Sequence, residues 1–289
     1  KAFASMDAMK YWRRVDWYNG GMEHTARHLL YARFWVQFLY NIGLVPSKEM
    51  IWTRVSHGMV LGSDNQKMSK SKGNVINPDD IINEYGADTL RVYEMFMGDY
   101  QQDAPWSTDS LKGCKRFIDK VVRLYDKVNE KEGFSSDLEV LQNKTIKAVD
   151  SDLERMSYNT YISSLMILTN AYDDKESITK EDYRLLLTLL NPVAPHVTEE
   201  LNENLGFKPI CESTWPIYDD AKLVQTEFDI AVQVNGKVRG TITINVNDSE
   251  DEIKNKALAC ENVKRHTEGK EIVKVIVIKN KIVNVVVKG

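Results

Sequence analysis

The spacing of the apolar residues changes near residue 223, and this change constrains the fold more than any other feature. From Thr108 onward, apolar side chains recur at helical spacing for about a hundred residues. After an irregular linker at 209–223 they alternate with polar residues, and Asn235-Gly236 marks a tight hairpin turn. Because helices and strands bury faces of different period, the sequence predicts an all-α region followed by a small α+β domain.

The helical region is predicted to form an antiparallel bundle at residues 111–222. Helices are expected at about 108–128, 138–156, 159–172, 180–190 and up to 205, with His196 a structural residue at the start of the last one. Six basic residues follow the polar side of the first helix: Lys112, Lys115, Arg116, Lys120, Arg123 and Lys127. This side is either a solvated face, which the interspersed Asp119 and Asp126 favour, or a surface for an RNA backbone.

The last domain, residues 223–289, is predicted to be a ββαββ unit. Two hairpins, the second turning around Asn280, flank one helix that a Ser249–Glu252 capping box opens and that ends near Glu261. Basic side chains lie at the tip of the first hairpin and after the helix, namely Lys237, Arg239, Lys264 and Arg265.

Residues 1–60 are predicted to be the end of an α/β nucleotide domain. A helix is expected from Met22 to about Ile42, opened by Gly20-Gly21, and a strand from Met50 to Leu61. A helix, a strand and then a basic loop are typical of a nucleotide domain whose ligand lies beyond the carboxyl end of the strand. No earlier βαβ repeat is expected.

The glycine pair and the polar residues behind it form a first candidate site. Gly20 and Gly21 let a ligand approach the backbone closely, and Glu23, His24 and His28 follow at once. His24 and His28 share one helix face, but no third ligand lies nearby, which argues against a metal site. The alternative is a solvent-facing turn with two histidines of no special role.

The second candidate site is the basic stretch Lys67-Met68-Ser69-Lys70-Ser71-Lys72-Gly73-Asn74, in a segment at 61–110. It lies between a polar run without period and a helix start at Asn77-Pro78, so a mobile loop is expected. Its lysines suit a polyanion such as a phosphate chain, and its serine hydroxyls add donors. The alternative is an ordinary solvated basic loop.

Composition argues against several classes of protein. The net charge of −4 does not fit a globally basic nucleic-acid binder, although local basic patches remain compatible with it. The three cysteines lie far apart, which argues against zinc and favours a reducing, cytoplasmic location. No apolar run is long enough for a membrane helix, and the missing initial Met suggests a piece of a longer chain.

The basic stretch resembles the KMSKS loop of class I aminoacyl-tRNA synthetases, and its surroundings narrow the resemblance. Further stretches carry it: Val15–His24 with His28–Tyr31, His57–Leu61, Tyr85–Arg91, Asn191–His196 and Val232–Gly240. Together they resemble bacterial leucyl-tRNA synthetases over essentially the whole chain, as a C-terminal fragment or small subunit. The resemblance implies the end of a Rossmann-like catalytic domain, a KMSKS loop with a stem-contact segment, an anticodon-binding-type bundle and a C-terminal tRNA-binding domain.

The roles that the resemblance implies carry over by position. Lys67 and Lys70 would be the catalytic residues that bind the triphosphate of ATP, with Ser69 and Ser71 beside them. Gly20, Gly21, Glu23 and His24 would line the adenosine pocket, Gly58, Met59 and Val60 would hold the adenine, and His28 would lie near the leucine pocket. Lys237, Arg239, Lys264 and Arg265 would bind tRNA(Leu). The reaction would be ATP-dependent activation of leucine, with Mg2+ on the phosphates, followed by transfer to the tRNA.

The chain also departs from the pattern of these enzymes. The sequence has no His-x-Gly-His-type motif and no editing domain. The expected partner is therefore a missing N-terminal half, which would belong to the same chain or to a separate subunit. This piece alone is expected to be inactive. Two alternatives stay open: the isoleucine, valine or methionine enzyme, and a stand-alone tRNA-binding or scaffold protein. The lack of cysteine clusters disfavours the first, and the intact KMSKS string disfavours the second.

Overall fold

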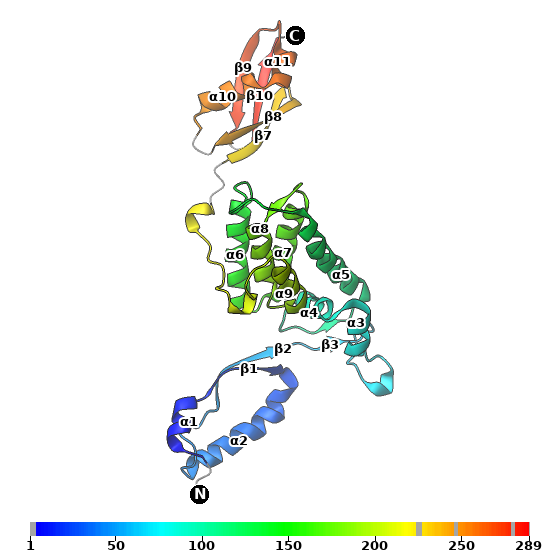
Figure 1. Cartoon of the computed structure of the whole chain (residues 1–289), viewed down its shortest axis with the longest axis vertical. Helices are drawn as coiled ribbons and strands as arrows, with labels where there is room; N and C mark the ends of the chain where they lie inside the picture. The colour runs from blue at the N-terminus through cyan, green and yellow to red at the C-terminus, as the bar shows by residue number, and fades with distance from the viewer. Residues whose placement is uncertain (1–3, 224–226, 246–247, 279–280, 289) are drawn as a thin grey trace. The chain divides into compact units, whose positions relative to one another are not determined.

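The computed structural model describes residues 4–223, 227–245, 248–278 and 281–288. The chain divides into two compact units, Lys1–Ile217 and Tyr218–Gly289, whose elements are labelled in Figure 1. The sequence placed the start of the last domain at about residue 223, a few residues after this division. No helix in the described ranges is both long and apolar enough to cross a membrane.

The first unit begins with a βαβ arrangement. After α1 (Met6–Trp12), strand β1 (Val15–Gly21) leads through a 3-10 helix (Met22–Ala26) into α2 (His28–Asn41) and then β2 (Ile51–His57). The two strands are parallel, with Val15 opposite Ile51 and Gly21 opposite His57. The sequence predicted the helix and the second strand of this unit and missed its first strand, β1.

The predicted helix from Met22 was also wrong in its start, because the helix begins at His28 and the glycine pair belongs to β1. The reason is tertiary: the β1 residues pair with β2, and the Arg54 guanidinium of β2 donates to the carbonyl oxygens of Gly20 (3.0 Å) and Gly21 (3.1 Å). Local spacing of apolar residues does not contain this contact.

The middle segment links the loop to the bundle. The predicted strand divides into β2 and β3 (Val60–Leu61), and β3 pairs in parallel with β4 (Ala104–Pro105). Two helices lie between them, α3 (Pro78–Tyr85) and α4 (Ala87–Phe96), and the first begins at the helix start predicted at Asn77-Pro78. Asn77 caps α3 by accepting from the Asp79 N–H, and Gly86 ends it with φ +91°, a conformation that glycine adopts at little cost.

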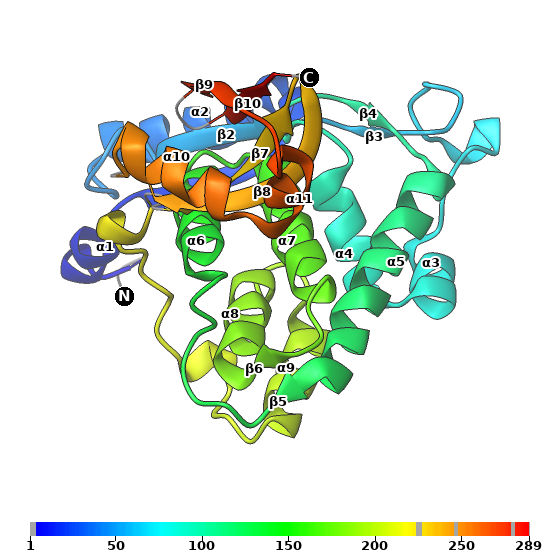
Figure 2. The same cartoon turned by 90° about the horizontal axis from the view of Figure 1, so that it is seen from above.

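The predicted helical bundle is present (Figures 1 and 2). Its elements are α5 (Thr108–Arg123), a 3-10 helix (Leu124–Lys127), β5 (Val128–Asn129), α6 (Glu139–Glu154), α7 (Tyr158–Asp173), β6 (Ile178–Thr179), α8 (Lys180–Leu190) and α9 (Pro195–Asn204). The core contains fully buried side chains from several helices, among them Leu111, Tyr161, Leu165, Tyr172 and Tyr183. Thr179 and Asp182 form a capping box that starts α8 where the sequence predicted it.

The second unit is a four-stranded sheet covered on one face by helices. A 3-10 helix at Ile210–Glu212 lies before this unit, and a second one at Asp220–Lys222 begins it. Its further elements are β7 (Glu227–Val234), β8 (Lys237–Asn245), α10 (Glu250–Ala259), α11 (Glu261–Thr267), β9 (Ile272–Ile278) and β10 (Ile282–Val287). The strand order is β8-β7-β10-β9, with β10 parallel to β7. Ile253, Ala257 and Val263 of the helices share one core with Val232, Val283 and other strand residues.

The predicted ββαββ order is incomplete, because a second helix, α11, follows the first. Cys260 has extended backbone angles (φ −60°, ψ 122°), so α10 ends there and α11 starts at Glu261. The turn predicted at Asn280 lies outside the described residues.

Candidate functional site

The predicted basic loop is present, and polar contacts between its two ends hold it closed. Asp64 Oδ1 accepts hydrogen bonds from Gln66 N (3.0 Å) and Asn74 Nδ2 (3.2 Å). Asn74 Oδ1 accepts from the Ser69 N–H (2.9 Å). These contacts involve the Asp64 carboxylate, the Asn74 amide and backbone N–H groups, and they leave the side chains of Lys67 and Lys70 exposed.

The two serines of the loop lie together. Ser69 Oγ and Ser71 Oγ are 2.9 Å apart and share a hydrogen bond. Lys70 to Lys72 form a 3-10 turn that ends at Gly73, whose φ of +67° suits glycine. The turn thus presents two hydroxyls and exposed ammonium groups, a donor set that fits an anionic ligand.

The loop and the end of β1 act on each other through Glu23. A hydrogen bond from its own backbone N–H lowers the pKa of Glu23. Desolvation opposes this effect, and electrostatic contributions from His24, Lys67 and His57 lower the pKa of Glu23 further. Two predicted site residues far apart in sequence, Glu23 and Lys67, therefore lie within electrostatic reach of each other.

The side chains of Glu23 and Arg54 pack closely against the backbone of the glycine pair. A Cβ on Gly21 would lie 2.3 Å from the Glu23 Oε2, so the side chain of Glu23 folds back against the glycine. Gly20 is less constrained, with the Arg54 Nη2 at 3.6 Å from an added Cβ. Arg54 holds both carbonyls and also contacts the Val55 carbonyl, while its buried Nε has no partner among the described residues.

The backbone at 58–60 is tied to the segment that follows α4. Gly58 N donates to Tyr100 O (2.9 Å), Met59 N donates to Asp103 Oδ1 (2.6 Å), and Met59 O accepts from Ala104 N (3.0 Å). Any contact of Gly58 or Met59 with an adenine has to use other atoms than these N–H groups, or follow a rearrangement of residues 100–103. Val60 is exposed and lies in β3.

His28 begins α2 and contacts a residue that the sequence did not indicate. Its Nε2 is 2.6 Å from the Tyr18 hydroxyl of β1, and the His24 ring meets the His28 ring edge to face with centroids 6.2 Å apart. The two histidines predicted to share a face are therefore neighbours, although His24 lies in the 3-10 helix and His28 in α2.

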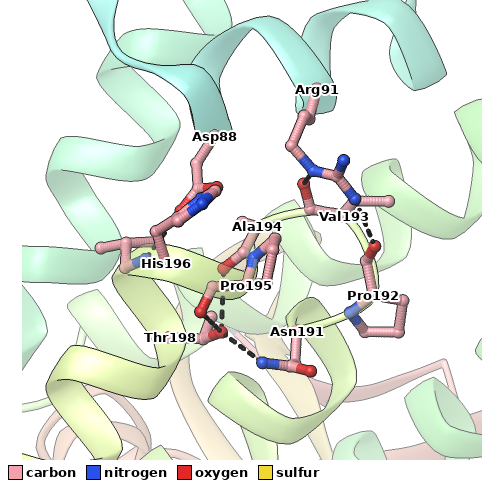
Figure 3. Close-up of polar contacts among 10 residues, drawn as sticks. Asp88, Arg91, Asn191, Pro192, Val193, Ala194, Pro195, His196 and Thr198 are labelled. Atoms are coloured by element: carbon pink, nitrogen blue, oxygen red, sulfur yellow. Dashed lines mark hydrogen bonds and ion pairs between the residues drawn. The ribbon is translucent and has the colours of Figure 1, made fainter.

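A polar joint connects the segment behind the loop to the bundle (Figure 3). Asp88, at the start of α4, accepts from the backbone N–H of Val197 (2.7 Å) and lies 2.7 Å from His196 Nδ1. Arg91, one turn further, donates to the carbonyl oxygens of Val193 (3.1 Å) and Pro192 (3.1 Å). The predicted structural role of His196 fits this contact, because it begins α9 and bonds to α4.

In the second unit, a glycine lets α11 approach the first hairpin. A Cβ on Gly240 would lie 2.7 Å from Cys260 Sγ and 3.5 Å from the side chain of Val263. The predicted tRNA-binding residues are exposed on these two elements, Lys237 and Arg239 on β8, and Lys264 and Arg265 in the last turn of α11.

Acidic side chains neutralise part of the basic side of α5 and of the 3-10 helix that follows it. Lys115 pairs with Asp119, and Lys120 and Lys127 both pair with Asp173, at 3.3 and 3.1 Å. These contacts favour the solvated-face interpretation for the three lysines.

Comparison with known proteins places the chain in a family. Residues 25–107 match the family described as tRNA synthetases class I (I, L, M and V), and residues 136–254 match the anticodon-binding domain of tRNA ligase. Over 286 residues, 99% of this chain, the sequence is 51% identical to a leucine–tRNA ligase of Alkaliphilus oremlandii (strain OhILAs). The chain belongs to the leucyl-tRNA synthetase family. It spans 36% of the length of that relative.

A solved structure agrees with this family membership. The LeuRS of Agrobacterium radiobacter K84, in a ternary complex with tRNA and LeuAMS, matches with a TM-score of 0.67 and 29% identity. The match covers 95% of this chain and 38% of the LeuRS chain.

Sequence reasoning missed several residues that shape the site. Arg54 fixes the end of β1, Tyr18 bonds to His28, and Asp64 closes the loop. A charged Arg within an otherwise strand-like run was the one available signal for Arg54, because a buried cation needs acceptors. The contact between Tyr18 and His28 has no local signature.

Proposed function

We propose that this chain is the part of a leucyl-tRNA synthetase that carries the KMSKS loop and the tRNA-binding domains. Joined to its missing N-terminal half, it would activate leucine with ATP and transfer it to tRNA(Leu). The observation that carries the proposal is the basic loop, which presents the hydroxyls of Ser69 and Ser71 and the exposed side chains of Lys67 and Lys70 to an anionic ligand. The charge of Lys67 is also among the causes that lower the pKa of Glu23, after the hydrogen bond from the Glu23 N–H, so a nucleotide would meet the loop and the end of β1 together, in one corner.

In this proposal each group of residues contacts a different part of the nucleotide. Lys67 and Lys70, with Ser69 and Ser71, bind the triphosphate, whose charge Mg2+ also neutralises. Glu23 binds the ribose, Gly20, Gly21 and His24 line the adenosine pocket, and Gly58, Met59 and Val60 face the adenine. His28 lies near the leucine. Catalysis comes from positioning and from cations aimed at the phosphates.

The exposed apolar face of α2 supports the missing half as a partner. Tyr31 is 74% exposed and Phe34 71% exposed, and Leu30, Trp35 and Phe38 are exposed as well. A helix that is apolar on most sides is normally buried. A cavity of about 680 Å³, whose lining includes the apolar side chains of Trp12, Val15, Val36, Met50 and Trp52, lies nearby. Further strands and helices of the catalytic domain would cover both.

The test is ATP–pyrophosphate exchange with leucine, measured for this chain alone and after addition of the N-terminal half of a leucyl-tRNA synthetase. Background exchange by the chain alone and measurable exchange by the mixture are expected. Robust exchange by the chain alone would contradict the proposal, and so would a mixture that exchanges valine or methionine in preference to leucine.

Lys70 is expected to act mainly on the transition state, because charge on the phosphates grows as the adenylate forms. In the completed enzyme, Lys70→Ala should lower kcat by roughly 10²–10³. A change confined to KM for ATP would instead make Lys70 a ground-state binder. Lys115→Ala, in an ion pair on α5 far along the chain, is the matched control.

The second unit is proposed to bind the tRNA body through Lys237, Arg239, Lys264 and Arg265. Deleting residues 223–289 from the completed enzyme should spare ATP–pyrophosphate exchange and abolish tRNA charging. Lys237→Ala with Arg239→Ala should lower the log–log salt slope of tRNA binding by roughly 0.9 per lost duplex contact. Intact charging after the deletion would remove this role. A stand-alone tRNA-binding protein is less well supported, because it has no use for a cationic loop close to Glu23.

A further inference from the structure

A cavity in the bundle lies apart from the nucleotide corner. It measures about 580 Å³ and is lined by α8 and by the segment 206–216, with Phe134 from the connection before α6. Its polar lining comes from Glu181 and Arg184 of α8 and from Lys208 and Ser213. The volume lies within the range of small-ligand pockets.

Arg184 is a fixed planar group in this lining. Its guanidinium carbon lies 4.3 Å from the centroid of the Phe207 ring, and its Nη2 donates to Ser213 Oγ (3.0 Å). Phe134 adds a second aromatic ring that is 54% exposed. Aromatic rings and arginine planes are the surfaces on which unstacked RNA bases stack.

Glu181 provides the specific feature of the cavity. Its Oε2 is buried and has no hydrogen-bond partner, one of three such side-chain atoms in the described ranges. A buried acceptor without a donor is costly, so the protein gains when the Glu181 carboxylate turns toward a ligand in the cavity and accepts its N–H. An apolar ligand would leave the oxygen unpaired, and the charges of Arg184 and Lys208 offset those of Glu181 and Glu212, so the lining does not favour an anion as such.

We propose that this cavity binds a single unstacked nucleobase of RNA, with guanine preferred. Guanine presents a ring N–H beside an exocyclic amine, and a carboxylate accepts hydrogen bonds from both. Adenine has the amine without the ring N–H, and hypoxanthine has the ring N–H without the amine. Only the source of the base, the tRNA, rests on the proposed function.

The test uses the full chain and mononucleotides, so it does not require catalytic activity. Calorimetric titration with GMP, IMP and AMP should give affinities in that order, since all three carry the same phosphate. Glu181→Gln should weaken GMP binding by on the order of tenfold or more, because a hydrogen bond to a charged group is lost. Glu200→Gln, an exposed charge change on α9, should leave it unchanged. Phe134→Ala should weaken all three nucleotides through lost stacking.

Several results would overturn the inference. They are no GMP binding up to about 10 mM, equal binding of GMP and AMP, and GMP binding that Glu181→Gln leaves intact in a folded protein. Binding of spermidine or a lysine peptide that depends on Glu181, without GMP binding, would assign the cavity to cations instead. A chain that binds GMP as expected but whose completed enzyme fails to charge tRNA(Leu) would refute the proposed function and leave the base site standing.

Discussion

Removing the Asp88 carboxylate is expected to destabilise the first unit more than its single charge would indicate. Asp88 is 7% exposed and accepts from the Val197 N–H at 2.7 Å. Helix α9 has no side-chain cap of its own, because Ala194 occupies the N-cap position and Pro195 follows it. Asp88 therefore caps α9 from another helix, where a carboxylate also suits the helix dipole.

The magnitude follows from the two hydrogen bonds. Loss of a charged acceptor for a largely buried N–H costs about 1.5–3 kcal/mol, and most of the effect comes from this bond. The His196 side chain is 72% exposed, so solvent screens the second contact to about 0–1 kcal/mol. Asp88→Ala should thus lower the free energy of unfolding by about 1.5–4 kcal/mol. Asp88→Asn, which keeps the shape and one acceptor, should cost about half as much.

The assay is guanidinium denaturation followed by tryptophan fluorescence. The six tryptophans, at positions 12, 17, 35, 52, 106 and 215, all lie in the first unit, so the signal does not report the second unit. His196→Ala is the control and should shift the midpoint least, giving the order Asp88→Ala, Asp88→Asn, His196→Ala. An effect of His196→Ala equal to that of Asp88→Ala would show that the ion pair, rather than the helix cap, stabilises the joint.

Three further predictions concern the loop and the glycines. Gly58→Ala should destabilise the first unit by about 1–3 kcal/mol or more by denaturation, because the new Cβ would lie 1.9 Å from a backbone oxygen after α4. The pKa of Asp64 is lowered, mainly by the hydrogen bond from the Gln66 N–H. The contacts that close the loop should therefore be fully present above the usual Asp pKa of 3.8 and be lost as the pH falls through the lower pKa of the folded state. Amide exchange followed by NMR can measure this loss, whereas trypsin is not active at such a pH. Gly240→Val should separate α11 from β8, because the new Cβ would lie 2.7 Å from Cys260 Sγ. This separation should weaken tRNA binding and speed the reaction of the Cys260 thiol with a maleimide. Unchanged thiol reactivity would contradict this packing.

Elements with local signals could be predicted from the sequence to within a few residues. Asn77 and Thr179 cap α3 and α8, and the glycine after α3 ends it, so these boundaries depend on groups within three or four residues of each other. The same holds for the position of the basic loop, because its lysines and its flanking helix start are contiguous. Local hydrogen bonds and sequence spacing carry the same information in these cases.

Most of the missed features depend on contacts between distant residues. Strand β1 exists because it pairs with β2 and because Arg54, 34 residues beyond Gly20, holds its carbonyls. The joint between Asp88 and Val197 spans 109 residues. The break at Cys260 that creates α11 is the exception, because it is local but lacks a Pro or Gly to mark it.

The joint between α4 and the start of α9 sets a rule for building chimeras of this family. Asp88 and Arg91 lie on one side of the predicted boundary at residue 110, and residues 192–197 lie on the other. A hybrid that takes the bundle from one relative and the loop segment from another would join two sides of this contact that come from different proteins, so their hydrogen-bonding groups need not match. Swapping residues 86–92 together with 190–198 as one block would keep the carboxylate opposite its N–H and the guanidinium opposite its carbonyls, and would allow the remaining helices to be exchanged freely.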